Sequence, residues 1–107
     1  MNNLETNTQN DELYFDENLD AQDKYWKNMY KALERLKENK DFQTVIQQGY
    51  ITDRALSDVS LLGSYSTIRQ GTRPDVMESL VAISRLQDFF RVIHNLGGPV
   101  AELDMEE

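Results

Sequence analysis

The stretch TRPDVMESLVAISRLQDFFRVIHNL, residues 72–96, decides the fold class. Its apolar residues recur at intervals of three or four, which is the spacing of one face of an α-helix. This stripe consists of Val76, Leu80, Ile83, Leu86, Phe90 and Ile93. Thr72 is a suitable N-cap, and Pro74 lies in the first turn, where its missing N–H needs no partner. The pattern predicts a long helix that ends at Gly97-Gly98-Pro99, a sequence typical of a helix terminus.

Further apolar residues widen this stripe beyond one helical face. They are Val81, Ala82, Phe89, Val92 and Leu96. A helix that is apolar on more than one side is expected to contact other helices or a second subunit. The last helix is therefore the best candidate for a subunit interface. Self-association is one way in which so small a chain gains stability.

The same spacing predicts a first long helix over residues 20–38, with an Asp as its N-cap. Its apolar face consists of Trp26, Met29, Tyr30, Leu33 and Leu36. Two short helices are expected to follow. Asp41 caps the first, which ends at Gly49, and Thr52 caps the second, which ends at Gly63. The apolar face of this second short helix consists of Ala55, Leu56, Val59 and Leu62.

These segments predict an all-α fold, a small bundle of three to four helices. The long first and last helices are expected to pack antiparallel. Residues 63–72, GSYSTIRQGT, are predicted to form the one substantial internal loop, because Gly, Ser and Thr are concentrated there. Three side chains of this loop, Tyr65, Ile68 and Arg69, either fold back on the domain or bind a partner, and we predict them as partner-binding residues.

The charge of the chain is divided between its ends and its middle. Residues 1–23 hold seven acids and residues 102–107 hold four more, with no Lys or Arg in either end. Residues 24–101 therefore hold eight of the 19 acids and all 11 bases, a net charge of +3. The overall charge of −8 belongs to the ends. We predict an acidic extended or disordered arm (residues 1–19, the N-terminal arm), a helical domain (20–97) and a flexible acidic tail (98–107).

The N-terminal arm carries apolar side chains among its carboxylates, a pattern suited to docking in a groove. These candidate partner-binding residues are Leu13, Tyr14, Phe15 and Leu19. Two hypotheses remain open. In one the arm docks on a basic face of its own domain, and in the other it binds a separate protein.

Composition excludes several kinds of chemistry. The chain has no Cys and a single His, which excludes disulfides, thiolate metal sites and a multi-His metal site within one chain. His94 is interpreted as structural, near the end of the last helix. Five acids are placed on helix surfaces by their positions, namely Glu34, Glu38, Asp58, Glu78 and Asp88. We therefore expect a non-enzymatic protein that needs no metal and no cofactor.

Membrane and nucleic-acid roles are not expected either. No apolar run approaches the ~20 residues that a membrane-spanning helix needs. The N-terminus is polar and acidic, without the basic segment of a secretory signal. The excess of acidic over basic residues argues against direct nucleic-acid binding, because contacts to phosphates need Lys and Arg.

Three motifs lie between residues 41 and 96. They are Phe-x-x-Val-Ile-x-x-Gly-Tyr from Phe42, Ala-Leu-x-x-Val-x-Leu-Leu from Ala55, and Leu-x-Ala-Ile-x-x-Leu-x-x-Phe-Phe from Leu80. In these motifs the chain resembles small helical proteins encoded by tailed bacteriophages, over about half of its length. The resemblance implies a phage origin and a place beside virion structural genes. We expect the protein in the host cytoplasm, in the virion, or in both. It brings no catalytic motif and assigns no role to individual residues.

Two hypotheses for the function follow. The first is a non-enzymatic virion-associated or assembly accessory protein that binds a larger phage assembly, with the N-terminal arm adding contacts. The second is an acidic inhibitor that occupies the nucleic-acid site of a host enzyme. The overall charge favours the second hypothesis, but the acids lie in the ends rather than on a rigid face, and the domain between them is basic.

Overall fold

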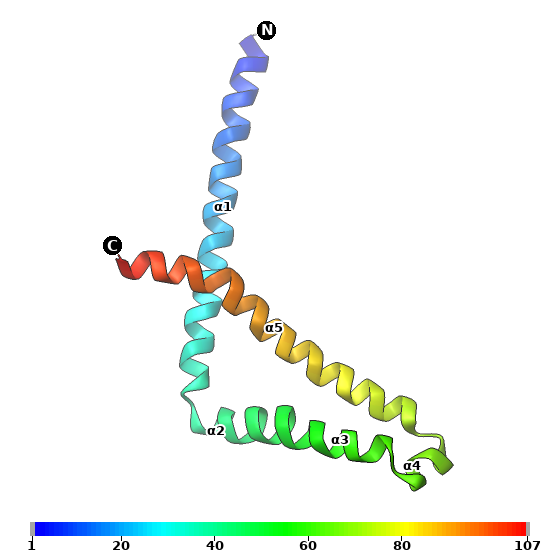
Figure 1. Cartoon of the computed structure of the whole chain (residues 1–107). Coiled ribbons are helices and arrows are strands. Elements are labelled where there is room, and N and C mark those ends of the chain that lie inside the picture. The colour runs from blue at the N-terminus through cyan, green and yellow to red at the C-terminus, as the bar shows by residue number, and fades with distance from the viewer. Residues whose placement is uncertain (1, 107) are drawn as a thin grey trace. The chain divides into compact units, whose positions relative to one another are not determined.

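The computed structural model describes the backbone of residues 2–106 and the side chains of residues 20–103. Every regular element over these residues is helical, so the predicted all-α class is confirmed. The elements are α1 (Asn2–Lys37), α2 (Lys40–Phe42), the π-helix η1 (Gln43–Arg54), α3 (Ala55–Leu62), α4 (Tyr65–Gln70) and α5 (Arg73–Glu106) (Figure 1). The predicted contact between the long first and last helices is confirmed as well.

The chain divides into two compact units, which are described one at a time. The first unit combines Met1–Ala32, which is most of α1, with Ile93–Glu107, the end of α5. The second unit is the continuous segment Leu33–Val92. It contains the end of α1, all of α2, η1, α3 and α4, and the greater part of α5.

α1 includes the N-terminal arm, for which we predicted an extended or disordered chain. The helix begins at Asn2 and therefore runs through this segment. The side chains of residues 1–19 lie outside the described part of the protein. Docking of the arm, on its own domain or on another protein, stays a prediction.

Within the first unit, α5 and α1 approach each other closely at Gly97. A Cβ atom on Gly97 would lie 2.6 Å from the Cβ of Tyr30 and 2.9 Å from the carbonyl carbon of Trp26, and it would also overlap the Trp26 carbonyl oxygen. One turn further along, Ala101 is buried too. The backbones of α1 and α5 can approach this closely because the two α5 residues at the contact, Gly97 and Ala101, have small side chains or none.

The prediction that the last helix ends at Gly97-Gly98-Pro99 is wrong, because α5 continues through these residues to Glu106. A Gly pair followed by Pro is typical of a helix terminus. Pro99 also lacks the N–H that would bond to the Asn95 carbonyl. The close contact with α1 accounts for the difference: Gly97 is needed here for its missing side chain, not for a left-handed backbone.

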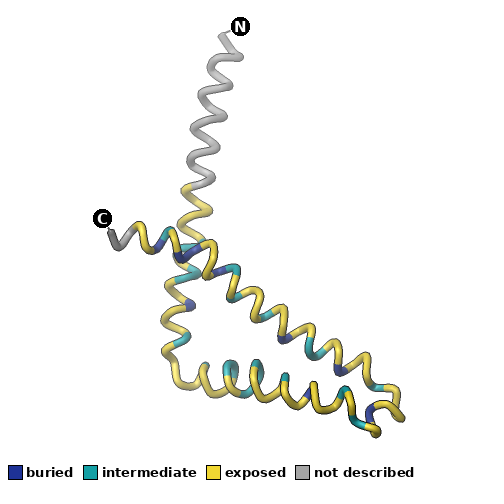
Figure 2. The backbone as a smooth tube through the Cα atoms, in the orientation of Figure 1, coloured by how far each residue is buried: buried dark blue, intermediate teal, exposed yellow. Residues whose placement is uncertain are grey.

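Within the second unit, the continuous run of α2, η1 and α3 lies antiparallel to α5. Three contacts define this arrangement: Phe42 with Phe90, Asp58 with Ser79, and Leu62 with Arg73. From Phe42 to Leu62 the residue numbers rise, whereas those of their partners fall from Phe90 to Arg73, so the two segments run in opposite directions. The apolar side chains buried in this unit are Leu33, Val76 and Ile83. Along α5 the buried positions recur on one side of the helix (Figure 2).

The first short helix is capped by Asn39 and not, as predicted, by Asp41. Asn39 has an extended backbone (φ −75°, ψ 123°), and its Oδ1 accepts a hydrogen bond from the backbone N–H of Phe42 at 2.9 Å. Asp41 lies one position inside the helix, in its first turn. There its carboxylate is stabilised by the positive end of the helix dipole without serving as the cap.

The predicted break at Gly49 is also wrong, because η1 passes through Gly49 and continues directly into α3. Side-chain hydrogen bonds in η1 join residues five apart. The Thr52 hydroxyl donates to the Gln47 carbonyl at 2.9 Å, and Gln48 Nε2 donates to Asp53 Oδ1 at 2.7 Å. This interval fits the i→i+5 turn of a π-helix. Thr52 therefore bonds within η1 and does not cap α3.

The prediction of a loop over residues 63–72 is corrected by α4, a short helix in its middle. The helix ends at Gly71, whose φ of 70° is left-handed. The N–H of Gly71 donates to the Ile68 carbonyl and the N–H of Thr72 donates to the Thr67 carbonyl, both at 3.2 Å. These two bonds form a Schellman motif, which satisfies the last carbonyls of α4 before α5 begins.

We predict that Gly97→Ala destabilises the first unit whereas Gly98→Ala does not. Both changes remove a Gly from a helix interior and gain about 1 kcal/mol of helix propensity. A Cβ on Gly98 would meet only the Tyr30 ring, at 3.4 Å, whereas one on Gly97 would overlap backbone atoms of α1. Overpacking of this kind costs about 1–3 kcal/mol or more. The measurement is denaturant unfolding monitored by the fluorescence of Trp26, the single Trp. Equal stability of the two variants would contradict the close approach.

Candidate protein-interaction surface

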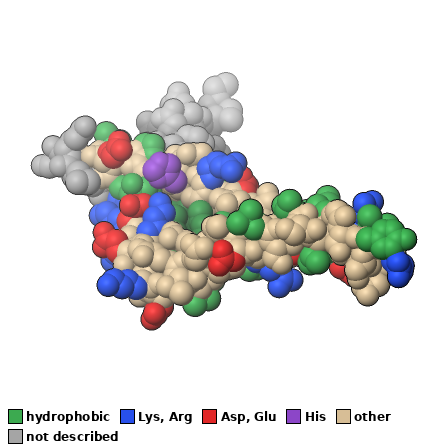
Figure 3. Space-filling view, turned by 60° about the horizontal axis from the view of Figure 1, so that its bottom comes forward, with side chains coloured by type: hydrophobic (Ala, Val, Ile, Leu, Met, Phe, Trp, Pro, Cys, Tyr) green, Lys and Arg blue, Asp and Glu red, His purple; other side chains and the backbone are tan. Residues whose placement is uncertain are grey.

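α4 carries three side chains that were predicted to bind a partner, and it presents them together. We define the α4 surface as Tyr65, Ile68 and Arg69. They are spaced i, i+3 and i+4 and so share one helical face, and all three are exposed. Thr67, which lies on another side of the helix, is buried. Hydrophobic and basic side chains are adjacent at the α4 end of this unit (Figure 3).

The guanidinium of Arg69 lies over the Tyr65 ring, with its Cζ 4.6 Å from the ring centroid. Such a cation–π contact contributes about 0.5–1 kcal/mol at an exposed site. Tyr65 is nevertheless 71% exposed, so most of its ring remains open to a partner. Tyr and Arg are enriched among residues that dominate binding energy at protein interfaces. The α4 surface thus presents an aromatic ring, an aliphatic side chain and an ordered cation.

The other predicted partner-binding residues belong to the N-terminal arm. They are Leu13, Tyr14, Phe15 and Leu19. Their side chains lie outside the described residues. Their role in binding stays a prediction.

A polar cluster that the sequence reasoning missed joins α3 to α5. Asp58, which we predicted on the helix surface, is only 2% exposed. Its Oδ2 accepts a hydrogen bond from the Ser79 hydroxyl at 2.5 Å, and its Oδ1 lies 3.4 Å from Nε of Arg54. Because Arg54 is largely exposed, water weakens the ion pair, and Ser79 supplies the better-shielded contact.

A structural role explains this polar cluster better than a catalytic role does. Both oxygens of the Asp58 carboxylate are engaged, and the side chain is shielded from any substrate. Among the described residues no buried polar side-chain atom lacks a hydrogen-bond partner. A slip of one residue between α3 and α5 would leave the carboxylate without Ser79, at the cost of an unsatisfied buried charge. Asp58 therefore holds the two helices in one register.

The position of Asp58 corrects the predicted orientation of α3 in part, because Ala55 and Leu62 face inward as predicted whereas two other residues do not. The side of the helix that faces α5 is formed by Ala55, Asp58 and Leu62. Leu56 and Val59, which we predicted in the apolar core face, are 64% and 58% exposed. The one sequence signal for this orientation is Arg54, placed four residues before Asp58 at ion-pairing distance on a helix.

His94 contacts an aromatic ring. Its ring centroid lies 5.7 Å from that of Tyr30, within the first unit. The described part of the chain contains no group of three or more His, Cys, Asp or Glu side chains that would hold a metal ion. None of the helices described there has the length and apolar character needed to cross a membrane.

Comparison of the chain with protein-family models, with curated proteins and with solved structures found no match. The resemblance to phage proteins over residues 41–96 therefore stays a prediction.

We predict that Ser79→Ala destabilises the protein by about 1–3 kcal/mol, because the buried Asp58 carboxylate then loses its hydrogen-bond donor. Ser84→Ala is the matched control, since Ser84 is exposed on the same helix. It should change stability by about 0.5 kcal/mol or less. The free energies of unfolding are measured by urea denaturation of both variants. Equal values would show that the contact between Asp58 and Ser79 contributes nothing to stability.

Proposed function

We propose that this chain is a non-enzymatic bacteriophage protein, associated with the virion or accessory to its assembly, that acts through protein–protein contacts. The observation that carries the proposal is the α4 surface. It offers an exposed Tyr ring with an Arg stacked on it at the end of a packed pair of helical segments. Tyr and Arg are among the residue types that most often anchor protein–protein interfaces.

The amount of exposed apolar side chain supports the same proposal. Within Leu33–Val92, few apolar side chains are buried, and large ones are exposed on several elements. The exposed ones include Val45, Leu56, Val59, Leu61, Met77, Val81 and Phe89. Scattered exposed apolar residues are normal, so the support comes from those that share one face of a helix, such as Met77 and Val81 on α5. A protein that works within an assembly covers this surface with its neighbours.

The N-terminal arm fits an assembly role through its sequence. Its apolar residues lie among acids, whereas residues 24–101 carry a net positive charge. A second contact made by the arm raises the effective concentration of the first contact and strengthens binding without a larger folded interface. The proposed location is the host cytoplasm, the virion, or both.

We predict that Tyr65→Ala combined with Ile68→Ala reduces capture of phage structural proteins by about tenfold or more, because truncated interface anchors each cost about 1–2 kcal/mol. The tagged full-length protein is used to capture partners from infected cells, and these are quantified by mass spectrometry. Ser66→Ala combined with Gln70→Ala is the control, since both residues are exposed on α4 outside the α4 surface. Circular dichroism verifies that both variants remain folded.

The captured proteins also separate the two hypotheses for function. Capsid, portal or tail proteins, lost with the Tyr65→Ala and Ile68→Ala changes, support the assembly role. A host nucleic-acid enzyme captured without any virion protein would refute it and favour the acidic inhibitor. In that case binding should weaken steeply as salt is added, because it depends on exposed charges.

Deletion of residues 1–19 tests the N-terminal arm. We expect the shortened chain to keep its helical circular dichroism and its unfolding transition but to bind the partner more weakly, since the arm contributes contacts and not core. If the shortened chain unfolds instead, the arm docks on its own domain. Binding that is unchanged by the deletion would remove the arm from the interface.

A further inference from the structure

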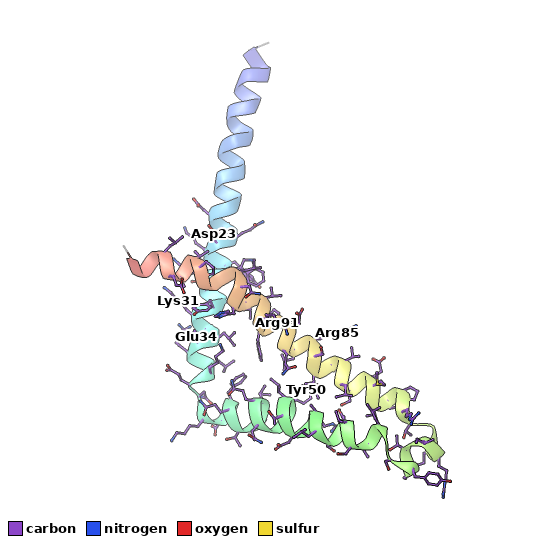
Figure 4. All side chains as sticks on the ribbon, in the orientation of Figure 1. Asp23, Lys31, Glu34, Tyr50, Arg85 and Arg91 are labelled. Atoms are coloured by element: carbon purple, nitrogen blue, oxygen red, sulfur yellow. The ribbon has the colours of Figure 1, made fainter. Side chains whose placement is uncertain are left out.

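The outward side of α5 within Leu33–Val92 forms a second exposed apolar surface, distinct from the α4 surface. Met77, Val81 and Phe89 lie along it and are between 36% and 49% exposed. Val76 and Ile83, on the opposite side of the helix, are buried. Arg85 continues the four-residue spacing and lies on the side of α5 turned away from η1, whereas Tyr50 of η1 lies on the side that faces α5 (Figure 4). We define the outer face of α5 as Met77, Glu78, Val81, Arg85 and Phe89.

Two opposite charges on this face have no partner within the described chain. Glu78 and Arg85 are both exposed, and neither takes part in an ion pair there. They are seven residues apart, which is two helical turns, so they lie on the same side of the helix about 10 Å apart. This separation is too large for a salt bridge within one helix.

A two-fold axis would bring these charges together. The midpoint between Glu78 and Arg85 falls between Val81 and Ala82. If a second copy packs antiparallel about this midpoint, each Glu78 opposes Arg85 of the other copy, and two reciprocal ion pairs form. Val81 then lies at the centre, with apolar contacts on both sides. A two-fold interface requires a surface that is complementary to itself, and Glu78, Arg85 and Val81 give the outer face of α5 this property. Asp88, which lies on the same side of the helix, is already paired with Arg91 of its own copy at 3.4 Å.

We propose that the outer face of α5 binds the same face of a second copy of this chain, antiparallel, with Glu78 and Arg85 paired reciprocally. A parallel arrangement is disfavoured because it opposes Glu78 to Glu78 and Arg85 to Arg85. A different protein would have to supply both charges and the apolar contact, whereas the chain itself already carries them. The dimer also covers apolar surface on a unit that buries few side chains of its own.

Charge exchange on the full-length protein tests this arrangement, with association measured by sedimentation equilibrium. Glu78→Arg and Arg85→Glu should each weaken dimerisation by about tenfold or more, because two attractive pairs become two repulsive ones. The double variant Glu78→Arg/Arg85→Glu restores the pairs and should dimerise as the original chain does. An equimolar mixture of the two single variants should form a one-to-one dimer. Lys40→Glu, an exposed change on α2, is the control for net charge and should have no effect.

A cysteine at the proposed axis gives an independent measurement. Because the chain contains no Cys, Val81→Cys places a single thiol on each copy, close to its equivalent in the dimer. Oxidation should yield a disulfide-linked dimer at concentrations where Leu56→Cys, exposed on α3, stays monomeric. Circular dichroism verifies the folding of each variant.

The following results would overturn the proposal. One is an original chain that stays monomeric at concentrations up to about 1 mM, at which a dimer with a Kd of about 1 mM or lower would be populated. Another is a double variant that remains as weak as the single ones. Equal crosslinking of the two Cys variants would also exclude an axis at Val81. The dimer does not depend on the proposed phage function, so these outcomes leave the test of the α4 surface unaffected.

Discussion

α5 contributes buried side chains to both units of this protein. Val76 and Ile83 are buried within Leu33–Val92, and Ile93 and Ala101 are buried within the other unit. A chain of 107 residues buries a smaller fraction of its surface than a larger protein does, so each buried side chain matters for stability. Both units therefore depend on the same helix, and a change that interrupts α5 removes apolar burial from each of them.

The contact between Asp58 and Ser79 explains why α3 presents apolar side chains outward. A buried carboxylate is costly unless it is paired, so the orientation that gives Asp58 its hydrogen bond is strongly favoured. Leu56 and Val59 are then exposed. In the proposed assembly role, a partner covers these outward apolar side chains.

The helices themselves were largely predictable, whereas several of their ends were not. The spacing of apolar residues correctly predicted the long helix from Val76 to Ile93, since that spacing depends on neighbours within the same helix. The roles of Gly49 and Gly97 were not predictable in this way. A Gly ends a helix in one context and permits close packing in another, and only the neighbour of Gly97, the backbone of Trp26, distinguishes the two. The helix α4 was likewise not predicted from the sequence, because its segment has a loop-like composition.

By itself, the sequence determined the all-α class, the division of charge between ends and middle, and the absence of thiolate chemistry. These follow from composition and from patterns a few residues long. The tertiary structure alone decided which helical acid is buried, which side of α3 faces inward and which Gly lies against another helix. Asp58 and Ser79 are 21 residues apart, and their contact exists only once α3 and α5 are paired. Burial is set by such distant contacts, whereas helical periodicity is set by near neighbours.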